Sequence, residues 1–289
     1  MDDRLKLGLK LAPLLLPFLA VFAGGFLLAV AQSFGYLAPI PVHQGRLAGY
    51  AALFNDSRFW GSFGFSLYVS FFSGLVPVLI GTPLAFLIWK LPPVLRPFAI
   101  VYKIPLALPH LTVAFLVLIM WTQSGVISSL CARLGLIGGQ SDFPALLFAG
   151  NGLGLIAAYG YKGTSFVILM VYAVLQRLDR RLPAAATMLG ASRVDVFFRV
   201  VLPHVKPAAH TSFIILFLYA FGAFDIPYLL SESSPGMLSI RAYDLYFQRG
   251  LDHRPEAMAV LTVMFVFSAL FIHAHNRLNA KLESRERKL

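Results

Sequence analysis

The sequence predicts an all-α membrane protein with six transmembrane helices, and three observations lead to this fold class. Only 13% of the 289 residues are charged and 58% are hydrophobic, whereas a soluble domain has about 25% charged residues. Six apolar stretches each approach the ~20 residues that a helix needs to cross a bilayer. Finally, the Lys and Arg residues that give the net charge of +11 gather in alternate connecting segments.

The predicted spans are residues 11–30, 65–89, 98–121, 153–175, 211–230 and 257–275. Backbone groups in lipid are satisfied only inside a helix or a closed barrel, and a barrel would show alternating segments of about ten residues instead. The first stretch follows Arg4, Lys6 and Lys10 and resembles a signal peptide. It lacks a convincing small-residue cleavage pattern, so we interpret it as a retained span.

The distribution of basic residues predicts the orientation. Short cytoplasmic loops carry more Lys and Arg than external ones. With the N-terminus placed inside, 16 basic residues fall in cytoplasmic segments and 6 in external loops. The external ones are Arg46, Arg58, Arg133, Arg241, Arg249 and Arg254. Both termini are therefore expected in the cytoplasm.

Composition also argues against several other classes of site. Cys131 is the single cysteine, so an internal disulfide is excluded, and no Cys/His cluster has metal-ligand spacing. We therefore predict no bound metal and no catalytic site. The positive-inside rule explains the net charge without a nucleic-acid partner.

The longest hydrophilic stretch, residues 176–210, has the local chemistry of two short helices. Pro183 suits a first helical turn, and Gly190 sits where a helix ends in a left-handed conformation. Ser192 is the expected N-cap of a second helix, with Asp195 placed to complete a capping box. We expect this helix to cover about residues 193–202 and to end at Pro203. Its predicted apolar face is formed by Val194, Phe197, Phe198 and Val201.

The same loop resembles the EAA loop of the permease subunits of ABC importers. The pattern A-A-x-x-x-G followed by V-x-L-P carries the resemblance, and the Glu usual in that family is replaced here by Ala184. The expected coupling residues are Ala185, Ala186, Gly190, Ala191, Ser192, Arg193, Asp195, Leu202 and Pro203. In that family the loop docks on the ATPase subunit. The segments QRLDRRLPAAATMLGAS and FGAFDIPYLL are similar to the branch that imports polyamines, iron, thiamine and organophosphonates.

The resemblance implies a division of the chain and a set of partners. We expect an N-terminal span and external loop at 1–59, a permease core at 60–275 and a cytoplasmic tail at 276–289. The implied partners are a second permease, identical or homologous, two ATPase subunits and a periplasmic substrate-binding protein, in a bacterial inner membrane. ATP and Mg would bind to the ATPase subunits, and this chain would bind no cofactor.

Three ionisable residues inside predicted spans are candidates for the translocation path: Lys162, His110 and Asp225. Such groups are costly in lipid and usually face a pathway or a partner. Lys162 either meets an anionic group of the solute or pairs with Asp225. His110 lies beside two prolines that are expected to open its helix, and it also fits a hydrogen-bonded interior histidine. No acidic residue lies deep in a span, which disfavours a polyamine.

The sequence leaves the solute open. We expect a small polar, charged molecule moved by alternating access, with a sugar or glycerol-phosphate permease as the alternative. An ion-coupled secondary transporter would leave the coupling loop unexplained and would need broken helices at an internal repeat, which we do not find. A membrane enzyme would need a nucleophile–base or metal-ligand constellation, for which one histidine and one lysine are too little.

Overall fold

The computed structural model describes residues 3–36, 45–231 and 234–286, with side chains from residue 10 to residue 277 of these ranges. Parts of the predicted first external loop and of the cytoplasmic tail lie outside them. The described residues form helices and no strand, and six helical segments are long and apolar enough to cross a membrane. This confirms the predicted fold class. The six are Lys10–Ser33, Ser57–Lys90, His110–Arg133, Leu153–Leu175, Arg193–Gly222 and Leu251–Arg277.

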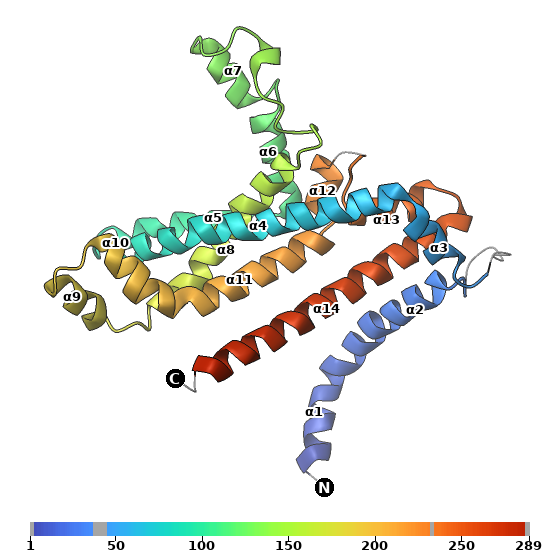
Figure 1. Ribbon diagram of the computed structural model, residues 1–289, viewed down its shortest axis with the longest axis horizontal. Helices are drawn as coiled ribbons and strands as arrows, with labels where there is room; N and C mark the ends of the chain where they lie inside the picture. The colour runs from blue at the N-terminus through green and yellow to red at the C-terminus, as the bar shows by residue number, and fades with distance from the viewer. Residues whose placement is uncertain (1–2, 37–44, 232–233, 287–289) are drawn as a thin grey trace. The chain divides into compact units, whose positions relative to one another are not determined.

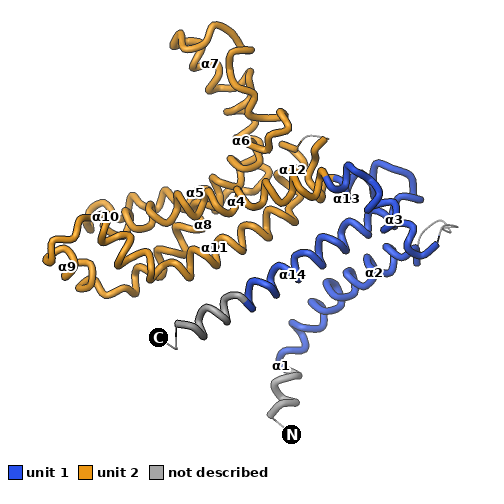
Figure 2. The backbone as a smooth tube through the Cα atoms, viewed as in Figure 1, with its two compact units in different colours: residues 1–60, 241–289 blue, residues 61–240 orange. Residues whose placement is uncertain are grey.

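The chain forms two compact units, coloured separately in Figure 2. Unit 1 combines Met1–Trp60 with Arg241–Leu289, and unit 2 is Gly61–Ile240. Unit 1 therefore brings together the two ends of the sequence. Its helices include α1 (Asp3–Phe18), a π-helical turn (Leu19–Ala23), α2 (Gly24–Ser33), α3 (Ala48–Asn55), a second π-helical turn (Asp244–Gln248), a 3₁₀ turn (Leu251–His253) and α14 (Arg254–Glu286).

Within unit 1, α2 and α14 run side by side (Figure 1). The rings of Phe26 and Phe265 join them, with centroids 4.0 Å apart. At the end of α3, Asp56 accepts a 2.7 Å hydrogen bond from Arg241, which also lies 3.5 Å from Glu256. Desolvation alone would raise the pKa of Asp56, but hydrogen bonds from Arg58 and Arg241 outweigh it and lower that pKa to about 2.

Unit 2 contains most of α4 (Ser57–Lys90) together with α8 (Leu153–Leu175) and α11 (Leu202–Gly222). Glycines let these helices approach closely. A Cβ on Gly74 would stand 3.0 Å from the Phe213 ring, and one on Gly81 would stand 2.9 Å from Val167. Gly163 of α8 likewise leaves room for Pro77 of α4.

The third predicted span is interrupted. It consists of a 3₁₀ helix (Arg96–Lys103), the short α5 (Ile104–Ala107) and α6 (His110–Trp121), with Leu108 and Pro109 extended between α5 and α6. Pro109 has no N–H to continue a helix and disfavours a helical Leu108. The expectation that prolines open this span is confirmed. Beyond α6, the chain continues into α7 (Val126–Arg133) and a 3₁₀ turn (Gln140–Asp142).

The fifth span differs from the prediction at both ends. Its helix α11 begins at Leu202 rather than Thr211, the helical segment as a whole reaches back to Arg193, and α11 stops at Gly222 before α12 (Asp225–Leu230) begins. The prediction that Pro203 ends the second loop helix is wrong. Helix α10 (Arg193–Asp195) continues through a π-helical segment (Val196–Val201) directly into α11. Pro203, which has no N–H to donate, stands where the π-helical segment passes into α11.

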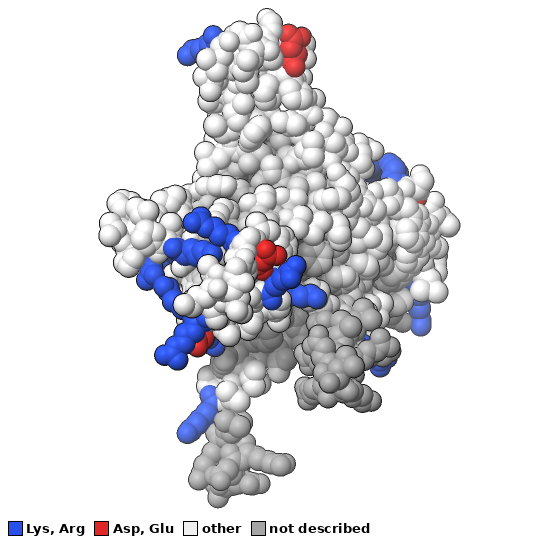
Figure 3. All heavy atoms as spheres, turned by 60° about the vertical axis from the view of Figure 1, so that its left-hand side comes forward, with Lys and Arg blue, Asp and Glu red and all other residues white. Residues whose placement is uncertain are grey.

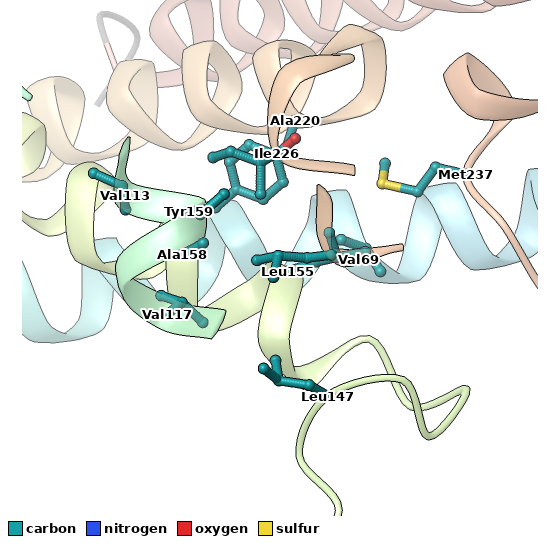
Figure 4. Packing of buried hydrophobic residues seen from close by; sticks show 12 residues of the cluster. Val69, Val113, Val117, Leu147, Leu155, Ala158, Tyr159, Ala220, Ile226 and Met237 are labelled. Carbon is teal, nitrogen blue, oxygen red and sulfur yellow. The ribbon is translucent and has the colours of Figure 1, made fainter. Parts of the chain in front are cut away.

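Two buried clusters hold unit 2 together. Figure 4 shows the first, in which Tyr159 and Leu155 of α8 pack against Val113, Ala220 and Ile226 from three other helices. The second lies towards the other end of α8 and joins Phe86 and Trp89 of α4 to Leu175, Val196 and Val201. It connects the membrane helices to the loop that follows α8. Helix α13 (Leu238–Tyr243) leads from unit 2 back into unit 1.

Candidate functional site

The loop after α8 folds into a compact helix–turn–helix. Helix α9 (Arg181–Met188) contains Pro183 in its first turn and carries Ala185 and Ala186. Gly190 has φ +86°, so it ends α9 in the predicted left-handed conformation. The N–H of Ala191 bonds to the carbonyl of Ala186 and that of Gly190 to the carbonyl of Thr187, the two hydrogen bonds of a Schellman motif.

The next helix starts as the sequence predicts. Ser192 Oγ accepts a 3.1 Å hydrogen bond from the N–H of Asp195, and a carboxylate oxygen of Asp195 accepts one from the N–H of Ser192 at 3.3 Å. This is the predicted capping box. The turn between α9 and α10 therefore satisfies several of its own N–H groups through local hydrogen bonds.

The predicted apolar face of the second helix is split in the structure. Val194 and Phe198 are exposed, at 63% and 58%, whereas Val201 is fully buried. Val196, which was not assigned to that face, is 1% exposed. The π-helical segment changes the angle per residue and so rotates later side chains relative to a 3.6-residue pattern.

The tip of this loop carries an apolar pair that the sequence analysis missed. Met188 and Leu189, directly before Gly190, are each 89% exposed. The sequence contains a local signal for this exposed pair, because two large apolar residues directly precede the glycine that ends the helix. Figure 3 shows Lys and Arg gathered around this end of unit 2. Arginines in and beside the loop include Arg177, Arg180, Arg181, Arg193 and Arg199.

The three ionisable span residues all lie in unit 2. His110 is the first residue of α6, Lys162 lies near the middle of α8, and Asp225 is the first residue of α12. His110 is close enough to Lys162 and Asp225 to interact electrostatically with both. Its ring packs on Tyr219 of α11, with centroids 5.1 Å apart.

Lys162 has partners other than the two expected from the sequence. Its Nζ donates a 3.1 Å hydrogen bond to the carbonyl of Pro105 and another to the carbonyl of Leu108. Among the ion pairs of the described residues, none joins Lys162 to Asp225. The interruption between α5 and α6 therefore lies beside the middle of α8.

The fold of the chain resembles that of a protein of known structure. It superposes on a subunit of a bacterial alginate ABC transporter, solved with an alginate-bound periplasmic protein, with a TM-score of 0.72 over 96% of this chain and 97% of that one. Their sequence identity is 20%, so this match concerns the fold.

Sequence comparison gives the family. The description "binding-protein-dependent transport system inner membrane component" matches residues 44–288, a wider range than the 60–275 expected. The chain is 30% identical over 243 residues to a sulfoquinovosyl glycerol permease of Agrobacterium fabrum, covering 82% of this chain and 77% of that protein. It is 27% identical over 276 residues to the spermidine/putrescine permease PotB of Haemophilus influenzae, covering 94% and 90%. The chain therefore belongs to the inner-membrane components of binding-protein-dependent transport systems, and is a permease subunit of a type I ABC importer.

Proposed function

We propose that this permease passes a small polar, charged solute from a periplasmic binding protein to the cytoplasm, driven by ATPase subunits that dock on α9. The apolar tip of Met188 and Leu189 carries this proposal. Two large apolar side chains held in water by a rigid turn mark a docking surface. A groove on a soluble ATPase would bury the tip, and the surrounding arginines would contact the groove's rim.

The solute class is supported by the relatives and by the charge inside unit 2. Two of the transporters named above carry anions, a sulfonated glycoside and alginate, and one carries polyamines. Lys162 provides a positive charge at mid-span. We therefore favour an anionic solute over a polyamine, with a neutral sugar as the alternative. Alternating access between two permease subunits would move it.

Co-purification tests the docking surface. The variants Met188→Glu and Leu189→Glu should lose the bound ATPase subunits, because each places a charge in a contact that must be dry. Leu136→Glu is the matched control, since Leu136 is an equally apolar residue that is 71% exposed elsewhere in unit 2. If all three variants retain the ATPase, α9 is not the docking element.

Cysteine labelling tests the orientation. A cysteine at Ser192 should react with an impermeant reagent only from the cytoplasmic side, and one at Ser234 only from outside. The charge bias supports this arrangement. Labelling from the opposite side at either position would contradict the proposed topology.

A further inference from the structure

Three basic residues of unit 2 lie around the end of α4, where the loop after α8 packs on it. Lys90 is the last residue of α4, Arg180 directly precedes α9, and Arg193 is the first residue of α10. All three are exposed, and Figure 3 shows basic side chains gathered over this end of unit 2. We call Lys90, Arg180 and Arg193 the basic triad.

Two aromatic rings hold members of this triad in place. Lys90 Nζ lies 4.5 Å from the centroid of the Phe86 ring, and the Arg180 guanidinium lies 5.3 Å from the centroid of the Trp89 ring. The two rings are stacked with centroids 6.3 Å apart, and both residues are buried. Cation–π contacts with buried rings therefore fix two of the cations. The third, Arg193, is close enough to Lys90 for the two charges to repel each other.

No carboxylate balances the basic triad. In the described part of the chain none of its members forms an ion pair, and the sequence has no Asp or Glu from residue 57 to residue 141. The two acidic residues of the loop have other partners. Asp179 accepts a hydrogen bond from the N–H of Arg181, and Asp195 accepts one from Ser192. The triad thus favours an anion from outside the chain.

The basic triad also lies at the end of a membrane helix. Helix α4 is long and apolar enough to cross a bilayer, and Lys90 is its last residue, where a lysine reaches the headgroup region. One turn deeper on the same side, Leu87 is exposed, followed by Leu84 and Ile80. Leu84 and Ile80 also line an apolar cavity of about 1050 Å³ that extends to α6 and α8. An acyl chain could follow this surface while its headgroup meets the cations.

From these contacts we propose that the basic triad binds the phosphate group of an anionic phospholipid. The inference rests on the proposed function, whose orientation places the lipid in the cytoplasmic leaflet. Its phosphate accepts charge-assisted hydrogen bonds from Lys90 and Arg193 and so removes their repulsion. Basic pockets between membrane helices on the cytoplasmic side are suited to such headgroups. Because Arg193 begins α10, the bound lipid fastens the docking loop to α4.

Hydrogen exchange of the purified importer complex in nanodiscs tests the lipid site. The parent is compared in phosphatidylcholine alone and in phosphatidylcholine with increasing amounts of phosphatidylglycerol, at matched ionic strength. We expect phosphatidylglycerol to slow exchange at residues 195–201, because it joins α10 to α4. Inorganic phosphate, added to the phosphatidylcholine nanodiscs at the same total concentration, should have no effect, since it has no acyl chain to keep it beside α4.

Variants of the repelling pair separate the lipid site from damage to the fold. Lys90→Gln removes one of the two charges, so exchange at residues 195–201 in phosphatidylcholine should already be slower than in the parent. The amount of phosphatidylglycerol needed for half of its effect should rise roughly fivefold. Arg193→Gln removes the other charge and should give the same two changes. Lys206→Gln, which removes an exposed lysine of α11, should respond like the parent.

Four results would overturn the inference. Equal exchange of the parent in the two lipids means that the basic triad binds no anionic headgroup. An equal effect of inorganic phosphate means that no acyl chain is involved, and an undiminished lipid effect in both glutamine variants places the lipid elsewhere. Loss of the ATPase subunits from Lys90→Gln in both lipids assigns the triad to an acidic surface of that partner.

The lipid site and the proposed function fail separately. A complex that retains its ATPase subunits but whose exchange ignores the lipid refutes the site and leaves the proposed function standing. Retention of the ATPase by Met188→Glu and Leu189→Glu would count against the docking surface, whatever the lipid does.

Discussion

The chain interrupts its helices in two contrasting ways. Between α9 and α10, the N–H groups of Gly190, Ala191 and Ser192 find partners within five residues, through the Schellman motif and the capping box. Between α5 and α6, the carbonyls of Pro105 and Leu108 find theirs in Lys162, more than 50 residues away in the sequence. One turn is closed by its own residues, and the other depends on another helix.

The difference follows from where each turn lies. Water competes for the groups of an exposed loop, so a local motif is sufficient and leaves the apolar tip free to dock. In a membrane helix, water is absent and each freed carbonyl needs a donor from the protein. The ammonium of Lys162 meets this need, and the carbonyls in turn offset a burial penalty of about 2.5–3.5 kcal/mol for a lysine at mid-span.

The largest loss of stability is expected for a substitution at a close contact between helices of unit 2. A Cβ at Gly163 would stand 2.7 Å from Cγ of Pro77 and 3.2 Å from Leu216. Because a proline ring inside a helix has little freedom to move, Gly163→Ala should destabilise the protein by about 1–3 kcal/mol. Gly160→Ala is the control, since a Cβ there meets nothing within 4 Å. The melting temperatures of the purified complex with each variant test this prediction. Equal melting temperatures for the two variants would show that α4 and α8 have room to separate.

A smaller loss of stability is expected for a substitution at Gly190, the glycine of the exposed turn. At Gly190 a Cβ also meets nothing within 4 Å, but φ is +86°, so the penalty there concerns the backbone alone. Gly190→Val should cost about 1–2 kcal/mol or more and uncouple solute-stimulated ATP hydrolysis from transport. Gly190→Asn, which tolerates this conformation, should retain coupling. Normal stimulated ATPase activity in the valine variant would contradict the role of this turn.

The capping box should contribute less. Ser192→Ala removes the acceptor for the N–H of Asp195 and should destabilise the start of α10 by about 1 kcal/mol. Ser192→Asn, which also caps helices, is the control. Hydrogen exchange at residues 193–196 measures the change, and unaltered exchange in the alanine variant would mean that packing of Val196 alone holds this helix.

The smallest change in stability near neutral pH is expected at Asp56. Its pKa is lowered to about 2 from a reference of 3.8, so its contribution is fully present above about pH 4 and is lost as pH falls towards 2. The difference in melting temperature between the parent and Asp56→Asn should therefore be constant near neutrality and shrink below about pH 4. A difference that stays constant down to pH 2 would contradict the link between Asp56 and Arg241.

The sequence by itself determined the features that depend on near neighbours or on bulk hydrophobicity. Apolar length gave six spans, and Gly190, Ser192 and Asp195 predicted a turn that the structure reproduces. Pro109 likewise predicted an opened helix. Each of these follows from a conformational preference or a hydrogen bond within a few residues, and such preferences are independent of the rest of the fold.

Only the tertiary structure determines which groups these local features contact. The sequence offered an anion or Asp225 as the partner of Lys162, and neither alternative included the carbonyls of Pro105 and Leu108. It also placed the end of a helix at Pro203, where packing of Val196 and Val201 against α4 and α8 carries the chain on through a π-helical segment into α11. Both outcomes depend on which helices lie together, because a buried group takes the partner that packing brings within reach, whatever its separation in sequence.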